Sequence, residues 1–269
     1  MFLEQNLLRF PQAKNASGVY GTAIHKALED AHILTRKEGK VPTLDVLIAS
    51  FTRELKRGRL QDFEEEKLLA RGQKVLEQYY TIKKKDIKGE HLVELNFAKQ
   101  SVMIDDALFT GKIDMVIEND DKEWVVVDLK TGKGFSDWDE SKLSVYDELK
   151  LHHYRYQLMM YKLLVENSRD YRDNTVTDGV LEFVEERGAT KTSVGNNRRT
   201  QEEVADNSIA TLSLSFDSTE SQNEVRRLRK LAVAVYKKIV ALDFPDTSNY
   251  EETLDGIKEF EEDLIEGTV

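Results

Sequence analysis

The sequence predicts an α/β fold with a mixed central β-sheet flanked by helices, preceded by an N-terminal helical lobe. The first observation is that helical spacing of apolar residues dominates the first 85 positions. The second is that β-rich segments separated by polar turns begin after residue 90. A helical segment then separates three of these segments from two more, and such an order is typical of α/β domains. The 269 residues, of which 40% are hydrophobic, suffice for one large domain.

Three helices are expected in the N-terminal third. The first runs from about Ser17 to Glu38, because Ser17 is a suitable N-cap and Gly39 a suitable stop. Two more helices are expected at about residues 43–59 and 62–85. We therefore expect a single domain over residues 1–269. Within it, a helical lobe of about residues 40–88 is inserted between the first helix and the sheet.

The strands follow the helical lobe. Three segments, HLVELNFA, LFTGKIDMVIEN and EWVVVDLKTG, have β-rich composition, and ELKLHHYRYQLMMYKLLVEN returns to helical spacing. Two further strands, GVLEFVEE and TLSLSF, enclose a polar, basic segment that is expected to be a long loop. A long helix, TESQNEVRRLRKLAVAVYKKIVALDF, and an acidic helix within residues 245–269 complete the order.

Composition excludes several classes of protein. The chain has no cysteine, so it forms no disulfide, thiolate metal site or iron–sulfur cluster. Its net charge of −11 argues against a general nucleic-acid coat protein. We find no signal peptide and no apolar run near the ~20 residues that span a bilayer, and therefore expect a cytoplasmic protein without a membrane partner.

Two strand segments place charged residues inside an otherwise apolar hairpin. With Asp121 at the centre of the NDDKE turn, Asp114 lies opposite Asp128, and Lys130 projects from the same face. Opposed carboxylates destabilise a sheet unless something neutralises them, and a divalent cation would do so. The alternative is that the carboxylates are solvated at the strand ends, with Lys130 as their ion-pair partner.

Four motifs occur in a fixed order around this hairpin. GTAIHKAL carries Gly21 and His25, HLVELNF carries Glu94, GKIDMVI precedes DLKTG, and YRYQLMMYKLL carries Gln157 and Tyr161. In this combination the sequence resembles the PD-(D/E)XK nucleases, and most closely their RecB-like branch. The resemblance implies a restriction-endonuclease-like core.

The same resemblance implies the site. The metal ligands would be His25, Asp114, Asp128 and the backbone carbonyl of Leu129, with Lys130, Gln157 and Tyr161 as further catalytic residues and Glu94 in a supporting role. The cofactor would be Mg²⁺ or Mn²⁺, and the iron–sulfur cluster of several relatives is excluded by the lack of cysteine. For each residue the plain structural role, in packing or in an ion pair, remains the alternative.

The function implied is a metal-dependent DNA nuclease, more specifically an exonuclease, acting in DNA repair, recombination or DNA degradation. Residues 4–25 resemble the junction between a UvrD-like helicase and its C-terminal nuclease domain, so a helicase partner in cis or in trans is expected. The chain lacks a G-x-x-x-x-G-K-[ST] phosphate loop and so carries no motor of that kind itself. The alternatives are an inactive DNA-binding or scaffold module of the same fold and an unrelated metal-binding α/β domain.

DNA binding requires cations that meet phosphates. Three clusters are candidates, at Arg53–Arg59, Lys191–Arg199 and Arg226–Lys230. Solvated helix faces or loops would give the same pattern.

Overall fold

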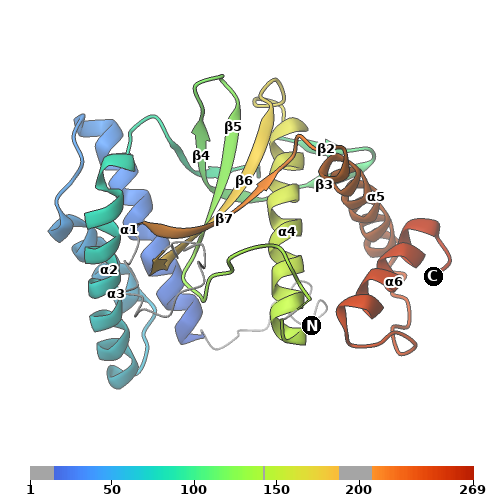
Figure 1. Cartoon of the computed structure of the whole chain (residues 1–269), viewed down its shortest axis with the longest axis horizontal. Coiled ribbons are helices and arrows are strands. Elements are labelled where there is room, and N and C mark those ends of the chain that lie inside the picture. Colours follow the sequence, from blue (N-terminus) through green and yellow to red (C-terminus); the bar gives the residue numbers. More distant parts are fainter. Residues whose placement is uncertain (1–14, 142, 188–207) are drawn as a thin grey trace, which may run out of the picture. The chain divides into compact units, whose positions relative to one another are not determined.

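The computed structural model describes residues 15–141, 143–187 and 208–269, and the chain divides into two compact units at Gly89. The described part of the first unit is helical, with α1 (Ala16–Glu38), α2 (Leu44–Arg57), α3 (Asp62–Lys83) and a short 3-10 turn, η2 (Lys84–Asp86) (Figure 1). The helix α1 packs against both α2 and α3. Its buried side chains Tyr20 and Ile24 share this core with Phe51 and Leu76.

The ends of α1 follow the rules of helix capping, with one correction to the expected start. The N-cap is Asn15, not Ser17, because the Asn15 side chain accepts a hydrogen bond from the backbone N–H of Ser17. Gly39 ends the helix as expected, with a left-handed φ of 70° and its N–H donating to the carbonyl of Thr35.

The second unit contains a five-stranded sheet in the order β1-β4-β5-β6-β7. Its strands are β1 (Leu92–Asn96), β4 (Lys112–Glu118), β5 (Trp124–Lys130), β6 (Val176–Arg187) and β7 (Ile209–Ser215). Among the described strands, the β5–β6 pair alone is parallel, so the sheet is mixed. A separate hairpin consists of β2 (Val102–Ile104) and β3 (Ala107–Phe109).

One expected strand is in fact two. The segment LFTGKIDMVIEN contributes to both β3 and β4, with Thr110 and Gly111 between them. At Gly111 a Cβ atom would lie 2.6 Å from Leu164 Cδ1, so the chain passes close to α4 here and leaves the direction of β3. The preceding strand β2 was not expected at all.

Three helices complete the second unit: α4 (Val145–Glu166), α5 (Thr219–Ala241) and α6 (Leu254–Glu266). The connection from β5 to β6 runs through α4, which packs against both strands (Figure 1). The helix α5 packs against α4, and α6 packs against α5. This architecture confirms the expected fold class, a mixed sheet flanked by helices. Among the described helices, none combines the length and the apolar run that a bilayer crossing requires.

Candidate active site

The β4–β5 hairpin has the register that the sequence predicts. Val116 pairs with Val126 and Glu118 with Trp124, around a turn in which Asn119 accepts hydrogen bonds at both of its oxygens. The same register places Asp114 beside the end of β5, where its Oδ2 accepts a hydrogen bond from the backbone N–H of Leu129 at 2.9 Å.

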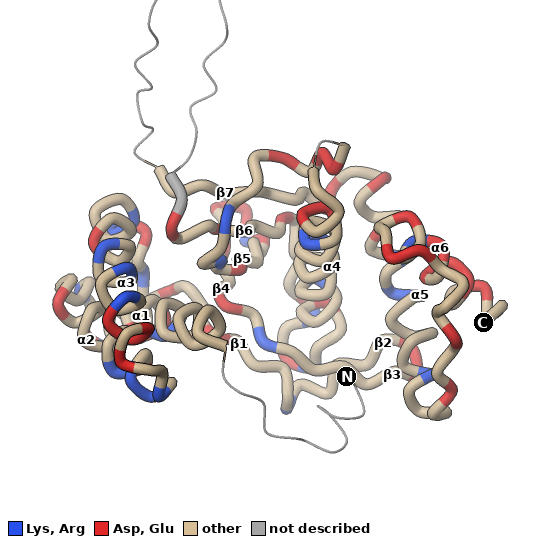
Figure 2. Tube along the Cα trace, turned by 90° about the horizontal axis from the view of Figure 1, so that it is seen from below, with Lys and Arg blue, Asp and Glu red and all other residues tan. Residues whose placement is uncertain are grey.

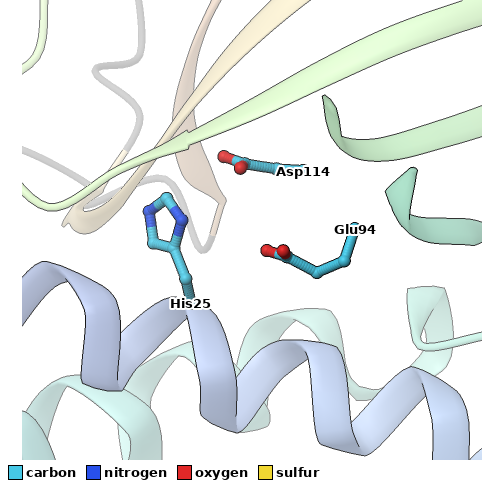
Figure 3. Close-up of side chains that lie close together, drawn as sticks. All are labelled: His25, Glu94 and Asp114. Atoms are coloured by element: carbon cyan, nitrogen blue, oxygen red, sulfur yellow. The ribbon is translucent and has the colours of Figure 1, made fainter. Parts of the chain in front are cut away.

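A third carboxylate, that of Glu94 on β1, lies near Asp114. The register on either side of Glu94, Val93 with Met115 and Leu95 with Ile113, places it opposite Asp114. A carboxylate oxygen of Glu94 lies within 4.8 Å of one of Asp114, and Figure 3 shows both side chains pointing to the same side. The sheet thus carries acidic residues in register on three neighbouring strands.

The backbone at Glu94 is strained. Its φ of 54° is left-handed, a conformation that a non-glycine residue adopts at a cost of about 1–3 kcal/mol. The strand pairs on both sides hold it there. The Glu94 carboxylate also forms an ion pair with Lys112 on β4.

Asp128 is the most buried of the three acids, with 2% of its surface exposed. Burial raises the pKa of this carboxyl; the Lys130 ammonium opposes the shift and the neighbouring Asp114 carboxylate adds to it. The negative charge of Asp128 beside that of Asp114 is therefore unfavourable, and a bound cation would offset the repulsion between the two carboxylates.

A closed hydrogen-bonded network joins Asp128 to α4. Lys130 Nζ lies 2.6 Å from Asp128 Oδ2 and donates to Gln157 Oε1 at 2.7 Å. The amide nitrogen of Gln157 donates to Asp128 Oδ1 at 2.7 Å and to the Tyr161 hydroxyl at 2.8 Å. Tyr161 in turn donates to Asp128 Oδ1 at 2.7 Å. Each polar end of Gln157 is used, and the amide orientation follows from the network.

The sequence did not single out Tyr154 as a site residue. Lys130 Nζ lies 4.4 Å from the centroid of the Tyr154 ring, so the ring covers the face of the ammonium. A signal was available, since Tyr154, Gln157 and Tyr161 recur at the three- and four-residue spacing of a single helical face.

His25 and the Leu129 carbonyl stay predictions as ligands. His25 is half-buried on α1 of the first unit, whereas the carboxylates belong to the second unit. For Leu129, the structure shows the N–H bound to Asp114. The arrangement of carboxylates nevertheless fits a hard divalent cation, because Glu94 and Asp114 offer oxygens to one space beside the buried Asp128.

Comparison with known proteins decides the family. The model of the PD-(D/E)XK nuclease superfamily matches residues 2–251. The chain belongs to this superfamily. Its members are nucleases that use divalent metals.

Two further comparisons add no argument about function. The solved structure described as "Crystal structure of SSO0001" is similar at 14% identity over 87% of this chain and 82% of that chain, with a TM-score of 0.28. A search of curated proteins finds no match.

Positive charge in this PD-(D/E)XK protein is concentrated in the helical unit. Residues 15–89 contain 15 lysines and arginines against 11 acidic residues, whereas residues 90–269 contain 22 against 38. Figure 2 shows the acidic residues along α6 of the second unit. The net charge of −11 therefore conceals a cationic helical unit.

The three expected DNA-binding clusters differ in what the structure shows. In the first, Arg53 and Arg57 form ion pairs with Asp30 and Glu54. In the third, Arg227 binds Glu261 and Glu262, and Arg229 binds Asp105. The second, Lys191–Arg199, lies outside the described residues.

Another group of cations gathers where α1 and α3 end. The carbonyl oxygen of Gly89 accepts a hydrogen bond from Arg36 at 2.7 Å, which brings the end of α1 beside the segment after η2. The exposed lysines of these segments are Lys37, Lys84, Lys85 and Lys88.

Proposed function

We propose that the protein is a Mg²⁺- or Mn²⁺-dependent deoxyribonuclease that hydrolyses phosphodiester bonds. The observation that carries the proposal is the network in which Lys130, Gln157 and Tyr161 all converge on buried Asp128. Such a network orients an acidic residue and an ammonium toward a common reaction centre, and a structural ion pair would not need the additional amide and phenol.

Asp114 and Asp128 are the proposed metal ligands, with His25 and the carbonyl of Leu129 completing the set. When bound, a divalent ion polarises a phosphoryl oxygen and lowers the pKa of water. Glu94 is a further carboxylate on the same side of the sheet as Asp114.

Lys130 is the proposed catalytic cation. Its ammonium keeps contacts with Asp128 and Gln157 that fix its position, and it has a further N–H to donate to the attacking water or to a phosphate oxygen. Charge that develops on the phosphate would be stabilised by such a preorganised donor. Gln157 and Tyr161 orient Asp128 and Lys130.

DNA is the proposed substrate, and the cationic helical unit supports this choice. Exposed lysines beside the end of α3 provide the phosphate contacts from which affinity for nucleic acid largely comes. We further propose cleavage from DNA ends, in repair, recombination or degradation, with a UvrD-like helicase supplying the strand. That part rests on the sequence resemblance alone.

The test is cleavage of end-labelled linear DNA and closed circular DNA, each single- and double-stranded, with Mg²⁺, Mn²⁺ or EDTA. Lys130→Ala is expected to lose cleavage while the protein stays folded, as shown by its circular dichroism. Lys122→Ala is the matched control, because Lys122 lies at the turn of the same hairpin and its side chain forms an ion pair with the exposed Glu118.

Cutting that needs metal and Lys130 would support the nuclease, and intact circles beside degraded linear DNA would support end dependence. If wild-type protein binds DNA but cuts nothing with either metal, the inactive binding module replaces the proposal. Equal activity of wild type and Lys130→Ala would remove Lys130 from the mechanism.

A further inference from the structure

One face of α4 carries a stripe of polar and aromatic side chains that extends away from the proposed catalytic residues. The residues recur at three- and four-residue spacing, which places them along one side of the helix. From the first turn of α4 inward they are Tyr146, Lys150, Tyr154, Gln157 and Tyr161. Exposure rises along the stripe, from 7% at Tyr161 through half-buried positions to 73% at Tyr146.

Lys150 is held by aromatic rings. Its Nζ lies 5.5 Å from the ring centroid of Phe135 and 5.6 Å from that of Tyr154. Among the described residues it has no carboxylate partner. A cation that rests on ring faces keeps its N–H groups available to an anion from solvent.

Tyr154 makes the stripe continuous with the catalytic centre. Lys130 lies over its ring, and Phe135 packs against the ring nearly edge-on, with centroids 6.1 Å apart. Burial raises the pKa of the Tyr154 phenol to about 12, and the charges of Asp128 and Tyr146 contribute to the shift. Tyr154 therefore lies between the exposed Tyr146 and the buried Asp128 of the catalytic centre.

We propose that Tyr146, Lys150 and Tyr154 form a track that binds a single strand of nucleic acid and leads it to the catalytic residues. The ring of Tyr146 would stack on an unpaired base, and Lys150 would contact the adjoining phosphate. Alternating rings and cations are the chemistry by which proteins hold single strands. The proposal rests on the proposed function, because that function gives the inner end of the stripe its role.

The occupant is a single strand because a base within a duplex does not offer its ring face. The residues around the track also point to stacking as its main source of affinity. Asp147 and Glu148 stand in the first turn of α4, where Asp147 binds the capping hydroxyl of Ser144. These carboxylates weaken attraction for a polyanion, so in the proposed track stacking on the Tyr146 ring, and not charge, supplies most of the affinity.

The experiment measures binding of fluorescein-labelled oligothymidylate and of a blunt hairpin duplex to the full chain, by anisotropy in EDTA, where no cleavage occurs. Tyr146→Ser is expected to weaken binding of the single strand by about tenfold, as expected for one lost stacking contact. Tyr146→Phe should restore it, since stacking needs the ring and not the hydroxyl. Lys150→Gln should lower the slope of log K against log salt by about 0.7 for the single strand.

Phe63→Ser is the matched control. Phe63 is 77% exposed and is the second residue of α3, as Tyr146 is of α4. Its loss should leave binding unchanged. The affinity lost in Tyr146→Ser should also be the same at low and high salt, which distinguishes stacking from charge.

An unchanged single-strand affinity in Tyr146→Ser would overturn the track, as would an equal loss for the duplex or a failure of Tyr146→Phe to restore binding. The result is independent of cleavage. If wild type cuts no DNA yet the single-strand preference depends on Tyr146, the proposed function fails and the track stands only as a binding site for a single strand. If wild type cuts DNA and the variants bind the single strand normally, the proposed function stands and the track fails.

Discussion

Replacing Tyr161 by phenylalanine removes one hydroxyl from the centre of the network. Tyr161 is 7% exposed, and its hydroxyl donates to Asp128 at 2.7 Å and accepts from Gln157 at 2.8 Å. A hydrogen bond to a charged group contributes about 1.5–3 kcal/mol. Because Gln157 still donates to the same carboxylate oxygen, Asp128 is not left without a donor, and we expect a loss of about 2 kcal/mol. For a chain of this size the melting temperature should fall by about 4–8 °C.

The affinity for the metal should change in Tyr161→Phe as well. The hydrogen bond from Tyr161 lowers the pKa of Asp128, so its removal raises that pKa further and metal binding requires a higher pH. Residues that orient ligands typically change metal affinity by about 10- to 100-fold. Isothermal titration calorimetry with Mn²⁺ at several pH values is therefore expected to show that Tyr161→Phe binds the metal more weakly than wild type. The pH at which its affinity reaches half of the maximum should also be higher than in wild type.

Tyr156→Phe is the control that removes a comparable hydroxyl of α4 outside the proposed active site, so it should change stability without changing metal affinity. Tyr156 lies on the same helix, and its hydroxyl donates to Glu261 at 2.6 Å and accepts from Arg227 at 2.8 Å. Its loss should lower the melting temperature while Mn²⁺ affinity stays at the wild-type value. If Tyr161→Phe also leaves Mn²⁺ affinity unchanged, Tyr161 is only structural. If it changes neither stability nor affinity, the Tyr161 hydroxyl does not form these hydrogen bonds in solution.

Three further predictions concern charge and packing. Burial raises the pKa of Asp128 in the folded state above its value in the unfolded chain. The metal-free protein should therefore lose stability as the pH rises from the unfolded-state pKa through the folded-state pKa. Urea unfolding should show no such loss in Asp128→Asn, and parallel pH profiles of the two proteins would contradict the prediction. Gly179→Ala would place a Cβ 2.9 Å from Leu158 Cβ, and urea unfolding should show a loss of about 1–3 kcal/mol. An unchanged free energy of unfolding would contradict the close approach of α4 to β6. Replacing exposed Lys84 and Lys85 together by glutamine should lower the salt slope of DNA binding by about 1–2, whereas the same change at exposed Lys237 of α5 and Lys258 of α6 should not. Equal slopes would place the DNA elsewhere.

The hairpin could be predicted because its information is local. A turn of five residues sets the register of β4 and β5, and period-two alternation then places Asp128 and Lys130 on one face. The α4 motif is equally local, since Gln157 and Tyr161 are one turn apart. The start of α1 was wrong for a related reason: Asn15 and Ser17 are both good caps, and only the backbone geometry distinguishes them.

The contributions of β1 and of the β2–β3 hairpin could not be predicted in the same way. Glu94 meets Asp114 through a pairing of strands whose register no short turn fixes, and its left-handed backbone contradicts the ordinary preference of glutamate. The strands β2 and β3 have three residues each, too few for alternation to be distinguished from a loop.

The crossover from β5 through α4 to β6 explains why the network is so complete. Asp128 and Lys130 end one parallel strand, and the helix that follows returns across the sheet with Gln157 facing them. Gly179, on the next strand, lets Leu158 of that helix approach within the space that a side chain would occupy. The proposed catalytic lysine and its orienting groups therefore belong to one strand–helix–strand unit. Asp114 and Glu94 come from β4 and β1, antiparallel strands on the other side of β5, so substitutions there should change metal affinity and leave the contacts between Lys130 and α4 intact. A change in the position of Lys130 should map to α4.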